Sequence, residues 1–163
     1  MPQTRTIDLG SGRSVTALLY QAAGTPVSTL VLAHGAGANQ SSAFMTAFAS
    51  GLAARGHDVV TFNFPYTERG RKLPDPQPVL EECFRAVLGV VASDPALGSR
   101  LLVIGGKSMG GRMATHVAAA QDTGESGPAP WWSRLAGLVL LGYPLHPPGK
   151  PQQVRVAHLP RIS

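Results

Sequence analysis

Residues 101–114 read LLVIGGKSMGGRMA, and this stretch predicts a buried strand, a very tight turn and a helix. Ser108 lies at the apex of the turn, in the pattern Gly106-x-Ser108-x-Gly110. A serine on such a turn is forced towards positive φ, and the residues two positions away on each side need to lack side chains so that strand and helix can pack closely. Glycine at both positions meets that requirement. The stretch therefore predicts a nucleophile elbow, named the elbow turn below.

Two other interpretations of this stretch are weaker. A phosphate-binding P-loop needs a glycine five positions before its Gly-Lys pair, and that position holds Leu101, inside the strand. The remaining alternative is a glycine-rich turn with an ordinary exposed serine. The elbow turn is favoured by the four apolar residues that run straight into it and by the helical spacing of the apolar residues after it, namely Met113, Ala114, Val117 and Ala118.

A second glycine-rich stretch, residues 34–39, follows the apolar residues 28–33 and reads HGAGAN. Small residues at the C-terminal end of a central strand let backbone N–H groups point into a cleft, which is what an oxyanion hole requires. A dinucleotide-binding G-x-G-x-x-G pattern is excluded, because Gln40 stands where the third glycine belongs. Residues 34–39 are named the glycine loop below.

Strands and helices alternate through the middle of the chain, without internal repeats. Helices are expected after Ser42, after Pro78 and after Ser108, with polar loops at residues 65–72 and 121–130. The expected strands are residues 4–9, 14–20, 28–33, 58–64, 101–104 and 138–142, the first two antiparallel and the last one buried. This order predicts an α/β fold with a doubly wound, mostly parallel sheet in one domain spanning residues 1–163.

The composition is that of a globular domain, with 163 residues of which 44% are hydrophobic and 14% charged. Its single cysteine, Cys83, excludes an internal disulfide and falls among apolar helix positions, which predicts a core thiol. The first residues lack an apolar leader segment, and no apolar run reaches membrane-spanning length. We therefore expect a cytoplasmic protein without a membrane partner.

The net charge of +5 raises the question of nucleic-acid binding. The fourteen basic residues are scattered, and the nearest approach to a cluster is Arg69, Arg71 and Lys72. A solvated basic loop is the better interpretation, so no nucleic-acid partner is expected.

The glycine loop and the elbow turn, together with residues 62–66 (FNFPY) and 142–149 (GYPLHPPG), resemble the α/β-hydrolase superfamily in its dienelactone-hydrolase-like branch. The similarity is closer still to the hydrolase-like family of a testis-expressed protein and of a subunit of the non-specific-lethal histone-acetyltransferase complex. It spans essentially the whole chain.

The resemblance implies a serine hydrolase without metal or cofactor, acting on a small-molecule ester or other activated acyl bond through an acyl-serine intermediate. It places Ser108 as the nucleophile and the backbone N–H groups of Met109 and Ala36 as the oxyanion donors. The other residues it assigns to the elbow turn and glycine loop are His34, Gly35, Gly37, Gly106, Lys107 and Gly110. Its candidate substrate-loop residues are Asn39, Asn63, Tyr66, Arg112 and His146.

The sequence departs from this family after the elbow turn. The family's triad runs in the order serine, acid, histidine, with the acid beyond the strand that follows residues 143–144. Asp122 and Glu125 are the only acids after Ser108, and both precede that strand. We therefore expect a sheet lacking its last strands and a chain that is inactive by itself.

The histidines offer no obvious base for Ser108. His116 is eight residues along the same helix, about 12 Å of rise away. His146 and His158 fall in loops that could approach the site, but neither has an evident acid to orient it. Lys107 and Arg112 are either surface cations or anchors for an anionic substrate group.

Two further expectations follow from the missing strands. Residues 138–142 would form an apolar edge strand without charge or proline, which favours self-association. A non-catalytic hydrolase-like module for protein contacts is the alternative to an enzyme.

Overall fold

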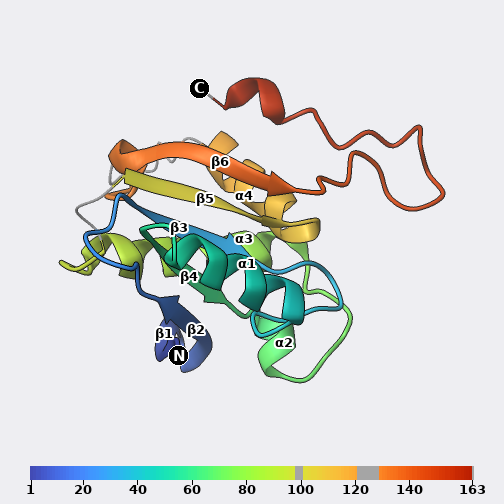
Figure 1. The fold of residues 1–163 in the computed structure, drawn as a ribbon. Helices are drawn as coiled ribbons and strands as arrows, with labels where there is room; N and C mark the ends of the chain where they lie inside the picture. The colour runs from blue at the N-terminus through green and yellow to red at the C-terminus, as the bar shows by residue number, and fades with distance from the viewer. Residues whose placement is uncertain (98–100, 121–128, 163) are drawn as a thin grey trace.

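In the described part of the chain, six strands form one sheet in the order β1-β2-β4-β3-β5-β6 (Figure 1). The structure is a computed structural model, which describes residues 1–97, 101–120 and 129–162. The strands are β1 (Gln3–Gly10), β2 (Arg13–Tyr20), β3 (Ser28–Ala33), β4 (His57–Phe62), β5 (Leu101–Lys107) and β6 (Leu135–Leu141). The helices are α1 (Ala43–Ala53), α2 (Pro65–Glu68), α3 (Gln77–Ser93) and α4 (Met109–Ala119), with the short 3-10 turns η1 (Trp132–Arg134) and η2 (Leu159–Arg161).

The sheet has an antiparallel entry followed by a parallel part. β1 pairs antiparallel with β2, and β2 pairs antiparallel with β4. The pairs β3–β4, β3–β5 and β5–β6 are all parallel. The sequence prediction of a mostly parallel, doubly wound sheet with a two-stranded entry is therefore confirmed.

Helices cover both faces of the sheet (Figure 1). α1 packs on one face through its buried side chains, and α3 and α4 pack together on the other. All six residues of β3 are buried, as expected for a strand covered on both faces. Cys83 of α3 is fully buried in the larger core cluster, so the predicted core thiol is confirmed.

The segment after β4 differs from the sequence prediction. Residues 65–72 were expected as a polar loop, but Pro65–Glu68 form a helical turn, α2. Proline suits the first turn of a helix because its φ is fixed and its missing N–H would have no partner there. Phe64 and Tyr66 are both buried, so this turn closes over the core at the end of the sheet.

β6 also differs from expectation, because its side chains are mostly half-buried rather than buried. The strand lies at the edge of the sheet as the structure describes it, paired only with β5, and Leu140 is 39% exposed. The chain then runs out as a long irregular stretch and returns to η2 (Figure 1). The predicted loop at residues 121–130 lies outside the described residues except for its last two.

None of the described helices is both long and apolar enough to cross a lipid bilayer.

Candidate active site

The elbow turn joins β5 to α4 within a single residue. Ser108 has φ 50° and ψ −111°, the positive φ that the sequence predicts, and its N–H donates to the carbonyl of Leu141 at 3.0 Å. A Cβ atom at Gly106 would lie 2.2 Å from the carbonyl oxygen of Ala33, and one at Gly110 would lie 2.3 Å from the same atom. Glycine at both positions is thus what allows the turn and α4 to approach the end of β3.

The glycine loop lies against the elbow turn. A Cβ at Gly35 would lie 3.6 Å from the Ser108 Cβ and 3.3 Å from the Lys107 carbonyl oxygen. The N–H of Met109 is the first of α4, where helical geometry provides no partner and the helix dipole favours negative charge. Neither this N–H nor that of Ala36 donates a hydrogen bond within the described part of the chain. Both N–H groups are therefore without a hydrogen-bond partner among the described residues.

His34 is fully buried beneath the glycine loop, with both ring nitrogens engaged. Its Nε2 accepts from the Phe64 N–H at 3.3 Å and lies 3.3 Å from the Thr67 hydroxyl. A backbone N–H can only donate, so the proton sits on Nδ1 and is donated to the Gly35 carbonyl at 2.8 Å. Burial lowers the pKa of His34, and the hydrogen bond to Gly35 opposes that shift more weakly. His34 is therefore neutral and is a structural partner of the loop.

The Gly35 carbonyl accepts a second hydrogen bond, from the Ala38 N–H at 3.2 Å. Because a peptide unit is planar and trans, fixing this carbonyl also fixes the Ala36 N–H, which points the opposite way. The turn continues through Gly37, whose φ of 73° suits glycine. His34 thus orients one of the two candidate oxyanion donors through the Gly35–Ala36 peptide.

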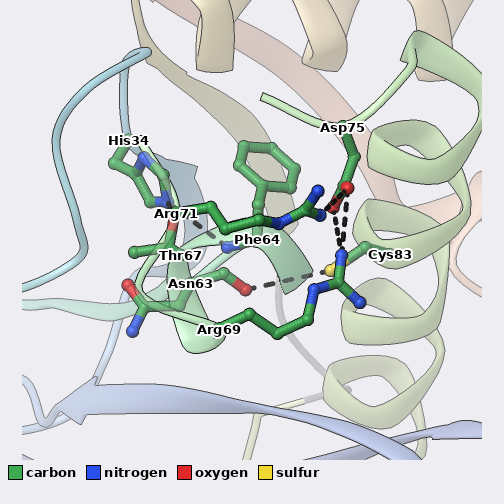
Figure 2. A network of polar contacts seen from close by, with 8 residues as sticks. All are labelled: His34, Asn63, Phe64, Thr67, Arg69, Arg71, Asp75 and Cys83. Atoms are coloured by element: carbon green, nitrogen blue, oxygen red, sulfur yellow. Dashed lines mark hydrogen bonds and ion pairs between the residues drawn. The ribbon is translucent and has the colours of Figure 1, made fainter. Parts of the chain in front are cut away.

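The segment after β4 contacts the glycine loop through hydrogen bonds to His34 and to the backbone of Gln40. Figure 2 shows His34, Phe64 and Thr67 converging, and the Cys83 thiol directed at the Asn63 carbonyl. The Asn63 side-chain oxygen accepts from the Gln40 N–H at 2.9 Å. This candidate substrate-loop residue is therefore bonded to the backbone just beyond the glycine loop.

Two other candidate substrate-loop residues also have structural contacts. Tyr66 is 1% exposed, and its hydroxyl lies near Thr67 and the Gly37 backbone without a well-formed hydrogen bond in the described part of the chain. Burial raises the pKa of Tyr66. The Asn39 side chain accepts from the Ser41 N–H at 2.9 Å, which closes the turn into α1.

Two of the three cations in the basic cluster of the sequence share a single carboxylate. Figure 2 shows Arg69 and Arg71 both reaching the Asp75 carboxylate, with Arg69 Nη2 2.9 Å from each oxygen. The Asp75 side chain is only 7% exposed, so its carboxylate is held in place while the two more exposed arginines reach it. These ion pairs hold the loop between α2 and α3.

The cations of the elbow turn point in different directions. Lys107 Nζ lies 4.2 Å from the centre of the Phe44 ring, at the start of α1. Arg112, one turn into α4, donates from Nη1 to the Gln77 side-chain oxygen at 2.8 Å.

None of the remaining described histidines reaches Ser108. His146 is exposed, with its Nδ1 3.0 Å from the Pro147 carbonyl oxygen. His158 comes from the C-terminal segment and packs against the second half of α4. Its Nε2 is 2.8 Å from the Thr115 hydroxyl, and its ring stacks on that of His116 with the ring centres 3.6 Å apart. Seven residues of helix separate Thr115 from Ser108, about 10 Å of rise. Asp122 and Glu125 lie outside the described residues.

The stacked pair formed by His116 and His158 makes the stability of the fold depend on pH. Burial, followed by the charge of His158, lowers the pKa of His116 from 6.5 to about 4, against the opposing effect of Glu81. Burial, then Arg161 and Arg112, also lowers the pKa of His158. Between pH 6.5 and about 4 the unfolded chain binds protons that the folded chain does not, so stability falls as the pH falls.

We expect the melting temperature to drop by about 5 °C or more between pH 7 and pH 4.5. His116→Gln removes one of the titrating rings and should flatten this profile, whereas His146→Gln, at an exposed position, should leave it unchanged. Circular dichroism melts of the three proteins at half-unit pH steps provide the measurement. A profile that is level across this range would contradict the burial of the pair.

Comparison with known proteins gives the family. A family model described as an α/β-hydrolase domain matches residues 26–163. The chain belongs to this α/β-hydrolase family. No curated protein matches the sequence significantly.

Solved structures agree with the family on the fold. The dienelactone hydrolase of Anabaena variabilis superposes with a TM-score of 0.75 at 16% identity, over 100% of this chain and 69% of that one. The α/β-hydrolase GrgF from Penicillium superposes with a TM-score of 0.71 at 14% identity, over 93% of this chain and 49% of that one. Esterase 2 of Thermogutta terrifontis, whose structure was solved with the protein phosphoramylated by tabun, superposes with a TM-score of 0.68 at 14% identity. The match covers 97% of this chain and 61% of that one. The chain of this α/β hydrolase thus spans between 49% and 69% of the length of these three proteins.

Sequence reasoning missed two residues that organise this α/β-hydrolase site. Thr67 contacts the buried His34, and Gln77 holds the Arg112 guanidinium. Both contacts join segments that are more than thirty residues apart, and no local pattern indicates them. The only available signal was that Gln77 directly precedes Pro78, where a helix was expected to begin.

Proposed function

We propose that the protein is a serine hydrolase in which Ser108 attacks an ester or other activated acyl bond and the N–H groups of Met109 and Ala36 bind the resulting oxyanion. The observation that carries this proposal is the positive φ of Ser108 at a strand-to-helix turn that touches the glycine loop. The family and the esterases and dienelactone hydrolase among its structural neighbours support hydrolysis as the reaction class.

In the proposed reaction the Ser108 Oγ forms a bond to the acyl carbon and its proton leaves to a base. The carbonyl oxygen becomes negative and is bound by the two backbone N–H groups. Collapse of this intermediate breaks the bond to the leaving alcohol, which takes up a proton, and leaves an acyl-serine. Water then attacks the acyl-serine and releases the acid.

The base is the part of the machinery that the described residues do not provide. Within them, no histidine or carboxylate hydrogen-bonds to the Ser108 hydroxyl. With oxyanion donors but no base, acylation by a highly activated ester is slow, and deacylation, which needs an activated water, is slower still. The acyl-serine should therefore accumulate.

This expectation tests the proposal. Incubation with p-nitrophenyl acetate should add one acetyl group per chain, located by peptide mass spectrometry on Ser108. Ser108→Ala should abolish the adduct. Ser42→Ala is the control and should retain the adduct, because the Ser42 side chain makes no capping hydrogen bond to α1 and its loss should not disturb the fold. An adduct of equal yield in Ser108→Ala would refute the assignment of the nucleophile.

The alternative, a non-catalytic module for protein contacts, is favoured by one observation, the exposed edge of β6. The strand carries no charge or proline and pairs on one side only in the described part of the chain. Such an edge can add a strand from a second copy. The resemblance to the testis-expressed and chromatin-complex family remains a prediction that fits this alternative.

We expect residues 1–163 to self-associate through β6. Leu140→Lys places a charge at an exposed position of this strand and should shift the protein towards the monomer, while Val27→Lys, at an exposed position before β3, should not. Size-exclusion chromatography with light scattering measures both. A monodisperse monomer of the unsubstituted chain at tens of micromolar would show that the edge is protected.

A further inference from the structure

The C-terminal arm, residues 143–162, leaves the end of β6 and returns to contact α4 through η2 (Figure 1). Within the described residues, one hydrogen bond joins the arm to the rest of the chain, between His158 Nε2 and the Thr115 hydroxyl at 2.8 Å. His158 is 5% exposed, and the plane of its ring lies within 14° of that of His116, on which it stacks. The polar attachment of the arm to α4 is therefore this one histidine.

The attachment is made by a neutral His158 ring. The Thr115 hydroxyl donates to the Arg112 carbonyl at 2.7 Å, so the proton between Thr115 and His158 has to come from His158 Nε2. A neutral imidazole provides that N–H. A second proton would add charge to the ring without adding a contact at Thr115.

The surroundings of the stacked pair disfavour a positive charge. Arg112 is four residues before His116 on the same face of α4, and the Arg161 N–H donates to the His158 carbonyl one turn later. Among the described residues, the carboxylate that faces the pair is Glu81 of α3, 3.9 Å from His116 Nδ1, and it is already in an ion pair on its own helix. Two protonated rings in contact, each with an arginine nearby, would repel each other.

The end of the arm contacts an apolar cavity of about 320 Å³. Ile162 lines this cavity together with Trp132, Leu135 and Leu138. The two tryptophans of the chain are neighbours here, because Trp131 directly precedes η1 and its ring packs edge-on against that of Trp132. Release of the arm would take Ile162 away from this cavity, and the tryptophan fluorescence of the chain would report it.

We propose that the stacked pair of His116 and His158 is a pH-sensitive latch, which releases the C-terminal arm from α4 when its rings take up protons, while the sheet remains folded. The latch does not depend on the chemistry at Ser108. A pair that only packs in the core would separate when the whole chain unfolds. The arm can leave by itself, because no other hydrogen bond joins its described residues to the sheet and helices.

The direction of the switch follows from the pKa of each ring. Burial, and then the charge of His158, lowers the pKa of His116 from 6.5 to about 4, with Glu81 opposing the shift. Attachment is therefore strongest above pH 6.5 and weakens as the pH falls towards 4. His116 alone weakens it roughly 80-fold between pH 8 and pH 4.5. Burial, followed by Arg161 and Arg112, also lowers the pKa of His158, which adds to the effect.

The first test separates release of the arm from unfolding. Tryptophan fluorescence, recorded from about pH 8 to pH 4, should change with a midpoint between about pH 6 and pH 4.5, while the far-UV circular dichroism keeps its neutral value. Protonation of the buried His34 would disturb the core and would appear in both signals. Coincident changes in the two signals would overturn the latch.

The second test changes the pair. His158→Phe keeps an aromatic ring on His116 but cannot take up a proton, so the fluorescence change should move to the pH at which the chain unfolds. His146→Gln, at an exposed position of the same arm, should leave the midpoint where it is. An unaltered midpoint in His158→Phe would contradict the proposal.

Hydrogen exchange of the unsubstituted chain decides the matter should His158→Phe not fold. After correction for the intrinsic pH dependence of exchange, the backbone amides of η2 should lose protection at least tenfold between about pH 7 and pH 5, while those of β3 and β5 retain theirs. Equal loss in the arm and in the central strands would show that no separate release occurs.

Discussion

Gly110→Ala is expected to destabilise the fold by more than about 4 kcal/mol, which is a large fraction of the roughly 5–15 kcal/mol that stabilises an ordinary domain. The new Cβ would lie 2.3 Å from the Ala33 carbonyl oxygen and 2.7 Å from that of His34. Both atoms belong to the backbone at the end of the central strand, so neither can move aside like a flexible side chain. Either α4 separates from β3 or the substituted chain does not fold.

Gly89→Ala is the matched control. Gly89 is also in a helix, α3, but a Cβ there would meet nothing within 4 Å. This substitution should therefore stabilise the protein by up to about 1 kcal/mol through helix propensity alone. Urea denaturation of the two variants separates a contact effect from a propensity effect. Equal stabilities would mean that α4 does not pack against the end of β3 as described.

Residues 1–163 are expected to turn over p-nitrophenyl acetate about 10⁴- to 10⁶-fold more slowly than an enzyme with a complete serine, histidine and acid triad. The elbow turn and the proposed oxyanion donors remain, so the residual rate should exceed that of the buffer and should be lost in Ser108→Ala. Initial rates after subtraction of the buffer reaction give the measurement, with Ser42→Ala as the control.

Rapid turnover that depends on Ser108 would contradict this expectation. It would show that a histidine of this chain reaches the serine in solution. His158 would then have to leave Thr115 and His116, and the variant His158→Gln would lose the activity. His146→Gln tests the other loop histidine in the same way.

The elbow turn and the alternation of strands and helices could be predicted because their determinants are local. Gly106, Ser108 and Gly110 are close in sequence, and their spacing predicts the tight turn once the apolar residues on either side are taken into account. The continuous apolar run of β3 likewise indicates a strand covered on both faces. These patterns account for the mostly parallel sheet.

The contacts that orient the site could not be predicted, because they depend on which distant side chains meet. His34 was expected to shape the glycine loop, but its tautomer is set by Phe64, thirty residues later. The stacking of His158 on His116 depends on where an irregular segment returns to α4. The burial of Tyr66 follows from the unexpected helical turn α2.

The pairing of β3 with β5 also determines when the site can form during folding. Ser28 pairs with Leu101, so the chain has to close a long loop, containing β4 and α3, before the central pair exists. Non-local pairing of this kind slows folding, because the entropy of loop closure is lost before the contacts form. Gly106 of the same strand lies against Ala33, so the step that closes the sheet is also the step that sets the turn at Ser108. The turn at Ser108 is therefore expected to form together with the pairing of the two central strands.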